Sequence, residues 1–202
     1  MRDIKNESRR TFDAQAEQYD QSRHGEHARH AYPVILEMLR KATPEKILDL
    51  GCGTGALLAQ VMELNHVEAA YGLDLSVKML AQAKHNIRGA TLVQGDAEHL
   101  PFEDCIFDAV YCNDSFHHYP NPKAVLAEVR RVLKQGGLFI LCDPYQEQGT
   151  LWITNFILRL TNTGHVSLYS KTELCSMMSD YFSGVVWHKV GYTAHLVSGV
   201  KR

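Results

Sequence analysis

Residues 46–55 read KILDLGCGTG, a short apolar strand that runs directly into a turn with three glycines. Glycine has no Cβ, so such a turn can bend sharply and bring backbone close to a ligand. Residues 56–64 follow with apolar side chains at helical spacing. The first N–H groups of a helix have no partner inside the helix. A strand, a glycine-rich turn and a helix in this order predict a ligand-binding turn at the edge of a sheet.

The alternation of strands and helices continues downstream. Further strands are predicted over 69–75, 90–95, 107–112 and 138–142, with helices over 76–86 and 122–133 between them. Strand-like segments 185–190 and 193–200 are separated only by Gly191-Tyr192, which is too short for a parallel crossover. We expect an α/β, Rossmann-like, doubly wound sheet of seven strands. It is mostly parallel, ends in an antiparallel hairpin and has helices on both faces.

The length of 202 residues fits a single domain spanning 1–202. Helices are expected over 7–19 and after Pro33, and they form an N-terminal helical cap over 1–43. Residues 146–170, after the fifth strand, form an expected insertion or lid. Helix 171–181 precedes the hairpin.

Composition excludes several classes of protein. The formal net charge is −2, from 21 Lys and Arg against 23 Asp and Glu. Such a chain has little long-range field for a nucleic acid or a membrane surface, so neither is an expected partner. The five cysteines are odd in number and lack CxxC spacing, which indicates neither a disulfide framework nor a zinc site. The N-terminal residues have no apolar signal core, so we expect a cytoplasmic location.

Acidic residues follow the predicted strands at the carboxyl edge, where doubly wound sheets bind ligands. Asp49 ends the first strand, and Asp74 ends the second. Asp74 lies about 20 residues beyond the glycine turn, the offset of an acid that binds a ribose diol. It could instead cap the next helix, a role that Ser76 can also fill. Asp96 follows the third strand and suits the exocyclic amine of an adenine, and Asp143 follows the fifth.

Five segments together resemble the class I S-adenosylmethionine-dependent methyltransferases. The likeness covers nearly the whole chain and is greatest to the small-molecule group of ubiquinone and menaquinone biosynthesis. The segments are FDAQAEQYD (12–20), LDLGCGTG (48–55), YGLDLSVKML (71–80), GDAEHLPF (95–102) and FDAVYCNDSFHHYPNPKAVLAEVRRVLKQGG (107–137). The resemblance implies S-adenosylmethionine as cofactor, S-adenosylhomocysteine as product, and methyl transfer to a small-molecule acceptor.

The resemblance also implies roles for individual residues around the methionine part and the ribose of the cofactor. Gly51, Cys52 and Gly53 would run beside the methionine part, and Asp49 would anchor its amino group. Asp74 would bind the ribose.

Around the adenine, the resemblance implies that Leu75 packs on the ring face and that Asp96 and the N–H of Ala97 read its edge. Asn113 would lie near the amino acid end of the cofactor, and Tyr19 would close over the same end.

Two alternatives remain open from the sequence. Gly51, Gly53 and Ala56 satisfy the G-x-G-x-x-A pattern of a nicotinamide-dinucleotide oxidoreductase. Asp49 would then face a pyrophosphate, which is unfavourable, and a closing hairpin is unusual in that fold. A non-catalytic domain that binds S-adenosylmethionine for regulation is the second alternative, because binding motifs do not prove turnover.

In-line displacement from a cationic methyl donor needs positioning and exclusion of water more than a catalytic side chain. A general base helps only where the acceptor is protonated. We therefore predict no catalytic residue, and name His118, Tyr145 and His165 as candidates to face the acceptor. The pair His117–His118 could equally form a helix-start turn or pack beside the adenine.

His24, His27 and His30 are spaced by three and could share a helical face. Gly25 weakens a helix there and no acid or cysteine partner is evident, so we interpret them as a solvated face and predict no metal site.

Within the expected lid, Ile153, Phe156, Ile157 and Leu160 form a helical stripe. The stripe fits local core, a dimer contact or a substrate wall. It suggests a small, partly apolar acceptor and a monomer or homodimer.

Overall fold

Strand β1 (Lys46–Leu50) is an interior strand of a seven-stranded sheet. In the computed structural model, which describes residues 3–161 and 164–202, β1 pairs in parallel with β2 (Ala69–Asp74) and with β4 (Phe107–Asn113). The strand order is β3-β2-β1-β4-β5-β7-β6. The outer strands are β3 (Thr91–Gln94), β5 (Leu133–Pro144), β6 (Ser183–Val190) and β7 (Ala194–Val200).

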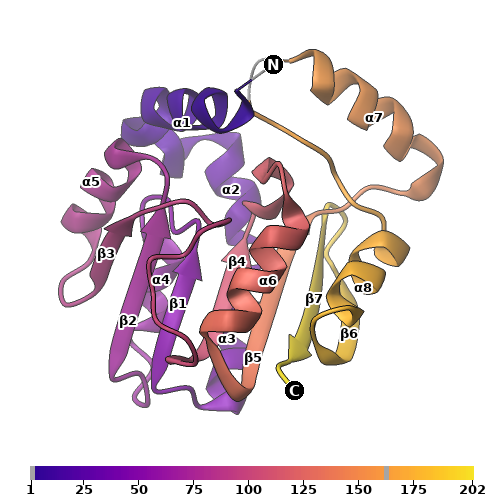
Figure 1. Cartoon of the computed structure of the whole chain (residues 1–202). Coiled ribbons are helices and arrows are strands. Elements are labelled where there is room, and N and C mark those ends of the chain that lie inside the picture. Colours follow the sequence, from indigo (N-terminus) through magenta and orange to yellow (C-terminus); the bar gives the residue numbers. More distant parts are fainter. Residues whose placement is uncertain (1–2, 162–163) are drawn as a thin grey trace.

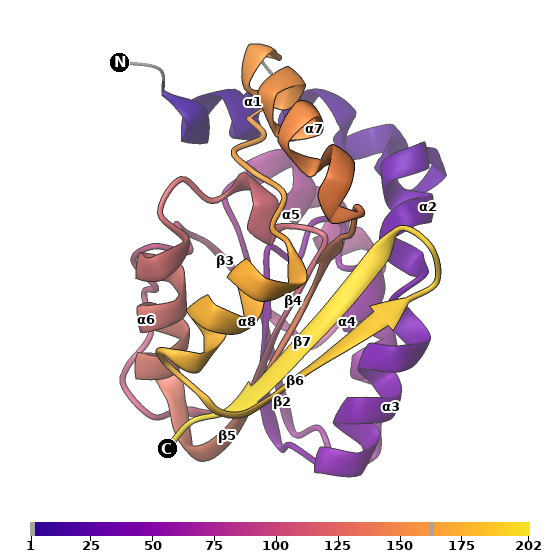
Figure 2. The ribbon, with the colours of Figure 1, turned by 90° about the vertical axis from the view of Figure 1, so that its right-hand side faces the viewer.

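The predicted fold class is confirmed. β7 runs antiparallel to both β5 and β6, so the last two strands form the expected hairpin (Figure 2). One boundary was wrong, because β5 begins at Leu133 rather than near residue 138. The glycines at 136 and 137 do not end the helix but sit within the strand, where Gly136 adopts φ +76°. Backbone bonds of Gly136 and Gly137 with Lys201 hold this irregular start.

Helices cover both faces of the sheet (Figures 1 and 2). Alternate residues of the central strands face opposite sides, as in any strand. Val110 joins the core formed with α6 (Pro122–Val132) and α8 (Lys171–Ser179). Its neighbour Tyr111 joins the core formed with α3 (Tyr32–Ala42), α4 (Ala56–Val61) and α5 (Val77–Asn86). The alternation therefore builds a three-layer α/β fold.

The N-terminal segment differs from its prediction. The expected helix over 7–19 is α1 (Ile4–Gln15) followed by the 3₁₀ turn η1 (Ala16–Gln21). A further helix, α2 (Arg23–Arg29), was not predicted, because Gly25 lies inside it. This glycine is required by packing, since a Cβ there would overlap the carbonyl oxygen of Tyr19. The side chain of Ser22 caps α2 by accepting a hydrogen bond from the Gly25 N–H.

The region after β5 contains α7 (Gln148–Leu160), which stands away from the body of the molecule (Figure 1). Its predicted apolar stripe does not enter a local core. Phe156 and Leu160 are 63% and 71% exposed, and Ile153 and Ile157 are also exposed. Residues 162 and 163 of the expected lid, and residues 1 and 2 of the expected cap, lie outside the described residues.

No helix among the described residues is long and apolar enough to cross a membrane.

The start of α8 offers a test of local stability. The Ser170 side chain accepts from the Glu173 N–H while the Glu173 carboxylate accepts from the Ser170 N–H, which is a complete capping box. Replacing Ser170 with Ala should lower the free energy of unfolding by about 1 kcal/mol in urea denaturation. Ser179→Ala, at the exposed end of the same helix, is the matched control and should change it by less than about 0.5 kcal/mol. Equal effects of the two substitutions would contradict this account.

Candidate functional site

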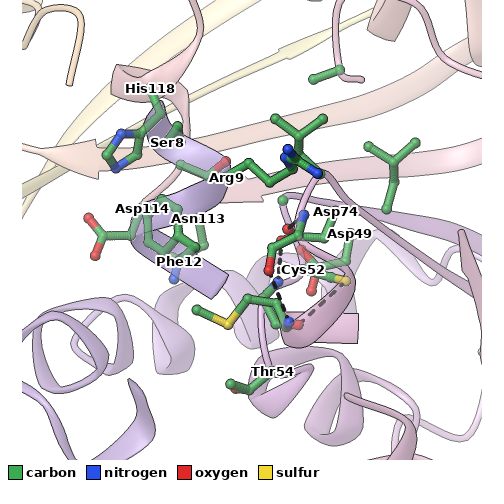
Figure 3. Close-up of a pocket in the computed structure, with 18 of the residues that line it drawn as sticks. Ser8, Arg9, Phe12, Asp49, Cys52, Thr54, Asp74, Asn113, Asp114 and His118 are labelled. Carbon is green, nitrogen blue, oxygen red and sulfur yellow. Dashed lines mark hydrogen bonds between the residues drawn. The ribbon is translucent and has the colours of Figure 1, made fainter. Parts of the chain in front are cut away.

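A pocket opens at the carboxyl ends of the central strands, beneath α1 (Figure 3). All ten residues that the sequence assigned to the cofactor line it, although they come from five separate segments. They are Tyr19, Asp49, Gly51, Cys52, Gly53, Asp74, Leu75, Asp96, Ala97 and Asn113. His118 lines the same pocket. Of the described residues, Tyr145 and His165 are not part of this lining.

The glycine turn after β1 is fastened to the end of β2. The N–H groups of Gly51 and Cys52 both donate to the Leu73 carbonyl oxygen, at 2.8 and 3.0 Å. Gly51 has φ +77°, and a Cβ there would overlap the Ser115 side chain. Gly53 also has a positive φ, but a Cβ on it would meet no atom within 4 Å. The turn therefore presents backbone to open pocket space.

Asp74 completes this fastening. One carboxylate oxygen accepts from the Gly53 N–H and the other from the Ser76 N–H, each at 2.8 Å. The Ser76 side chain, not Asp74, caps α5 by accepting from the Met79 N–H. The side chain of Asp74 is thus held at the pocket wall and is not consumed as a helix cap.

Burial dominates the electrostatics of the two acids at the strand ends. It raises the pKa of Asp49 to about 8, and the nearby charge of Asp74 adds to that rise, while the adjacent Tyr111 hydroxyl opposes it. Burial likewise raises the pKa of Asp74 to about 6, against the backbone N–H groups of Ser76 and Gly53. The pocket therefore disfavours negative charge here unless a cation enters.

The N-terminal segment is tied across the pocket mouth at three points. The Lys5 amino group contacts Asp96 and Glu98, each at 2.6 Å. The other two ties are hydrogen bonds from the Ser76 hydroxyl to Asp13 and from the Thr54 hydroxyl to Asp20, at 2.6 and 2.7 Å. Sequence reasoning did not single out the pocket-lining residues of α1, which include Lys5, Ser8, Arg9 and Phe12. Of these residues, only Phe12 lies in the FDAQAEQYD segment (12–20) that the resemblance identified.

The amide of Asn113 links β4 to α2, since its Nδ2 donates to the Ala28 carbonyl oxygen at 3.1 Å. Burial raises the pKa of the Tyr19 hydroxyl, with the charge of Asp114 as the next cause. That hydroxyl therefore stays protonated near neutrality.

His117 and His118 form the short 3₁₀ turn η2 (Phe116–His118) after β4, and both are buried. Phe12 of α1 meets the His118 ring edge-on at 5.0 Å. His165 stacks against His117 with ring centroids 5.1 Å apart and lies 4.5 Å from His118. The structure thus brings His165 beside the pocket residue His118.

Tyr145 lies elsewhere. Its N–H donates to the Thr193 carbonyl oxygen, and its ring contacts Trp187 and His195 of the hairpin. β5 continues straight into this pairing, which carries Tyr145 to the hairpin rather than to the pocket. The structure does not support its predicted place facing the acceptor.

The interpretation of His24, His27 and His30 as a solvated face was wrong for His27. Its Nδ1 lies 3.2 Å from Asp114 and its Nε2 lies 3.2 Å from the Thr193 carbonyl oxygen. Its hydrogen bond with Asp114 raises the pKa of His27, against the opposing effect of burial.

Comparison with known proteins gives the same assignment as the motifs. Residues 48–141 match the methyltransferase domain family. Over these residues, just under half of the chain, the sequence is similar to S-adenosylmethionine-dependent methyltransferases. A demethylmenaquinone methyltransferase of Thermotoga maritima is 35% identical over 130 residues, covering 62% of this chain and 56% of its own length. A fatty-acid O-methyltransferase of Mycolicibacterium smegmatis is 40% identical over 101 residues, covering 49% of this chain and 37% of its own.

This chain thus spans from about a third to just over half of the length of these two relatives. Among solved structures, a methyltransferase of Thermotoga maritima, described as a possible histamine N-methyltransferase, superposes with a TM-score of 0.74. It is 22% identical, and the match covers 96% of this chain and all of the other. This likeness concerns the fold alone.

The pKa of Asp49 allows a test that needs no ligand. The folded protein holds a proton on Asp49 at pH values where the unfolded chain does not, so this group's stabilising contribution is lost as pH rises from about 4 to about 8. Asp49→Asn mimics the protonated acid at every pH. The stability of the wild type relative to Asp49→Asn should therefore fall steadily between pH 5 and pH 8 in urea denaturation. A difference that stays constant over this range would show that Asp49 is not protonated by burial.

Proposed function

We propose that the chain transfers the methyl group of S-adenosylmethionine to a small-molecule acceptor by in-line displacement. The observation that carries this proposal is the pocket itself. Ten residues from five segments of the chain converge there, and each was assigned to the cofactor before any contact between them was considered. This convergence supports a ligand at the sheet edge, and the motifs that carry the residues favour S-adenosylmethionine as that ligand.

The charge of the pocket suits the methionine part of the cofactor. A sulfonium and an ammonium group are both cations, and they would enter beside Asp49, whose carboxylate is costly to ionise when the pocket is empty. The open space at Gly53 gives that part of the ligand a backbone wall without side chains. We place the methionine part along Gly51, Cys52 and Gly53.

Asp74 retains capacity for the ribose. Each of its oxygens accepts one backbone N–H, but an ionised carboxylate offers about four lone-pair positions. We place the adenine beyond it, with Leu75 against the ring and with Asp96 and the Ala97 N–H at its edge. Asp96 already holds the Lys5 amino group, so Lys5 would close over the adenine as well.

On the acceptor side, we assign His118 and, beside it, His165. We assign residues 1–43 as the cap over the cofactor and 146–170 as the acceptor lid of one domain. The exposed stripe of α7, together with Trp152 at 70% exposure, fits a partly apolar acceptor. The two relatives, a demethylmenaquinone methyltransferase and a fatty-acid O-methyltransferase, support this class.

The side chains of the protein would take little part in making or breaking bonds. The cofactor supplies an activated cationic methyl group, and the pocket holds the acceptor's nucleophilic atom in line with it. The three contacts of Lys5, Asp13 and Asp20 with the pocket rim hold the N-terminal segment over the pocket, where it would exclude water from the reacting atoms. The nicotinamide alternative is not retained, because residues 48–141 match the methyltransferase domain family and the hairpin is present.

The assignment of Asp74 is tested with S-adenosylhomocysteine in calorimetry. Asp74→Ala should weaken binding by about 1–3 kcal/mol, the cost of losing a hydrogen bond to a charged acceptor. Asp180→Ala, an exposed acid at the end of α8, is the matched control and should bind normally.

Because Asp74 also holds the glycine turn, a second ligand separates the two roles. An analogue without the 2′-hydroxyl should bind the wild type more weakly, and Asp74→Ala should weaken its binding by less than it weakens that of S-adenosylhomocysteine. Independent, additive losses would remove the ribose assignment.

Turnover is tested by incubating the protein with methyl-labelled cofactor and cell extract. We expect label to appear in a small organic-soluble molecule. Tight binding of S-adenosylhomocysteine without label transfer would instead indicate the non-catalytic binding domain. Binding of NADH alone would contradict the proposal altogether.

A further inference from the structure

A cluster of three histidines lies on the acceptor side of the pocket, and the proposed methyl transfer gives it no role beyond facing the acceptor. His117 and His118 come from η2, and His165 comes from the segment after α7. One ring nitrogen from each lies within 4.8 Å of those of the other two. The three side chains are separated by up to 48 positions in the sequence, so no local spacing reveals them. Figure 3 shows the His118 ring at the edge of the pocket.

Hydrogen bonds fix which nitrogen faces an acceptor in two of the rings. His118 Nδ1 lies 3.1 Å from the Gly164 carbonyl oxygen, and a carbonyl oxygen only accepts. His117 Nδ1 lies 2.9 Å from the Asp143 carboxylate, which also accepts. Both rings therefore direct Nδ1 at an acceptor, which leaves Nε2 as the nitrogen that a metal would bind. An imidazole held by a carboxylate or a carbonyl in this way is the usual partner arrangement of a metal-binding histidine.

His165 supplies the independent observation. Its Nδ1 is buried and has no hydrogen-bond partner in the protein. A buried nitrogen left unpaired costs free energy unless something outside the chain satisfies it.

We propose that His117, His118 and His165 bind a divalent first-row transition metal, such as Zn²⁺ or Co²⁺, with an open coordination position toward the pocket. Three imidazoles plus one open position is a known arrangement for such ions. A Zn–N distance of about 2.0 Å requires nitrogens about 3.3 Å apart, so the rings need to close by at most about 1.5 Å from their present spacing. This site replaces the sequence-based expectation of no metal.

Two carboxylates, Asp143 and Asp114, lie beside the three histidines, and we assign them as supporting groups rather than as metal ligands. Asp143 orients His117, and Asp114 pairs with His27 of α2 at 3.2 Å. Asp114, His117 and Asp143 also lie within 4.8 Å of one another through one atom each. Their negative charge would compensate part of the charge of a dication beside these rings. If the proposed methyl transfer holds, an oxygen of the acceptor would occupy the open position and be held beside the methyl donor.

The test is titration of the purified, metal-free protein with Co²⁺, followed by visible absorption and calorimetry. The wild type should bind one equivalent and develop the absorption of a low-coordinate Co²⁺ complex. His118→Asn and His117→Asn retain a donor near the Nδ1 position but remove Nε2, and His165→Phe retains the stacked ring. Each should abolish that absorption. Asp143→Asn should weaken binding by roughly 10–100-fold.

The matched control is His188→Asn, an exposed histidine on β6, which should bind Co²⁺ as the wild type does. Binding of S-adenosylhomocysteine, measured in parallel, shows that each variant is folded and tests the proposed function separately. A wild type that binds no Co²⁺ below millimolar concentration would overturn the metal site. So would unchanged absorption in the three histidine variants, since the ion would then sit elsewhere.

Discussion

The attachment of the glycine turn to the end of β2 is the constraint on which the rest of the site depends. Two backbone bonds to Leu73 and one carboxylate oxygen of Asp74 hold the turn, while the other oxygen holds the start of α5. One side chain thus fixes two consecutive strand-to-helix connections relative to each other. The pocket floor is rigid because these connections share Asp74, and the positive φ angles of the glycines make that close approach possible.

The same arrangement carries an electrostatic cost. Asp49 and Asp74 are buried next to each other at a sheet edge, and ionising both in an empty pocket is unfavourable. A cationic ligand offsets that cost at the point where it binds. Because Asp49 holds a proton below about pH 8 in the free protein, binding of such a ligand is linked to release of that proton, and the affinity includes the cost of ionising the acid.

The sequence was informative wherever a local pattern decides the structure. The run KILDL, buried on both faces, could only be a central strand, and the two-residue break at Gly191 forced a hairpin. The sequence was uninformative where tertiary packing decides the local structure. Gly25 argued against a helix by propensity, yet α2 forms there because the Tyr19 carbonyl oxygen leaves no room for a side chain. The apolar stripe of α7 predicted helix correctly but not its exposure.

The site shows the same division. The ten residues named for the cofactor line one pocket because parallel strands end at one edge of the sheet. Tyr145 lies outside that lining, because β5 pairs with β7 up to Pro144 and the Tyr145 N–H bonds to Thr193. The contact of His165 with His118 depends on the conformation of the segment after α7. The sequence has no periodic pattern there from which that conformation could be predicted.

Gly164 lies against the backbone of Ser8, where a Cβ would overlap the Ser8 main chain. The segment that returns from α7 is therefore pressed against the helix that covers the pocket. Neither can swing outward without disturbing the other. The covers of the two proposed halves of the pocket are therefore in mechanical contact, so a displacement of one is transmitted to the other.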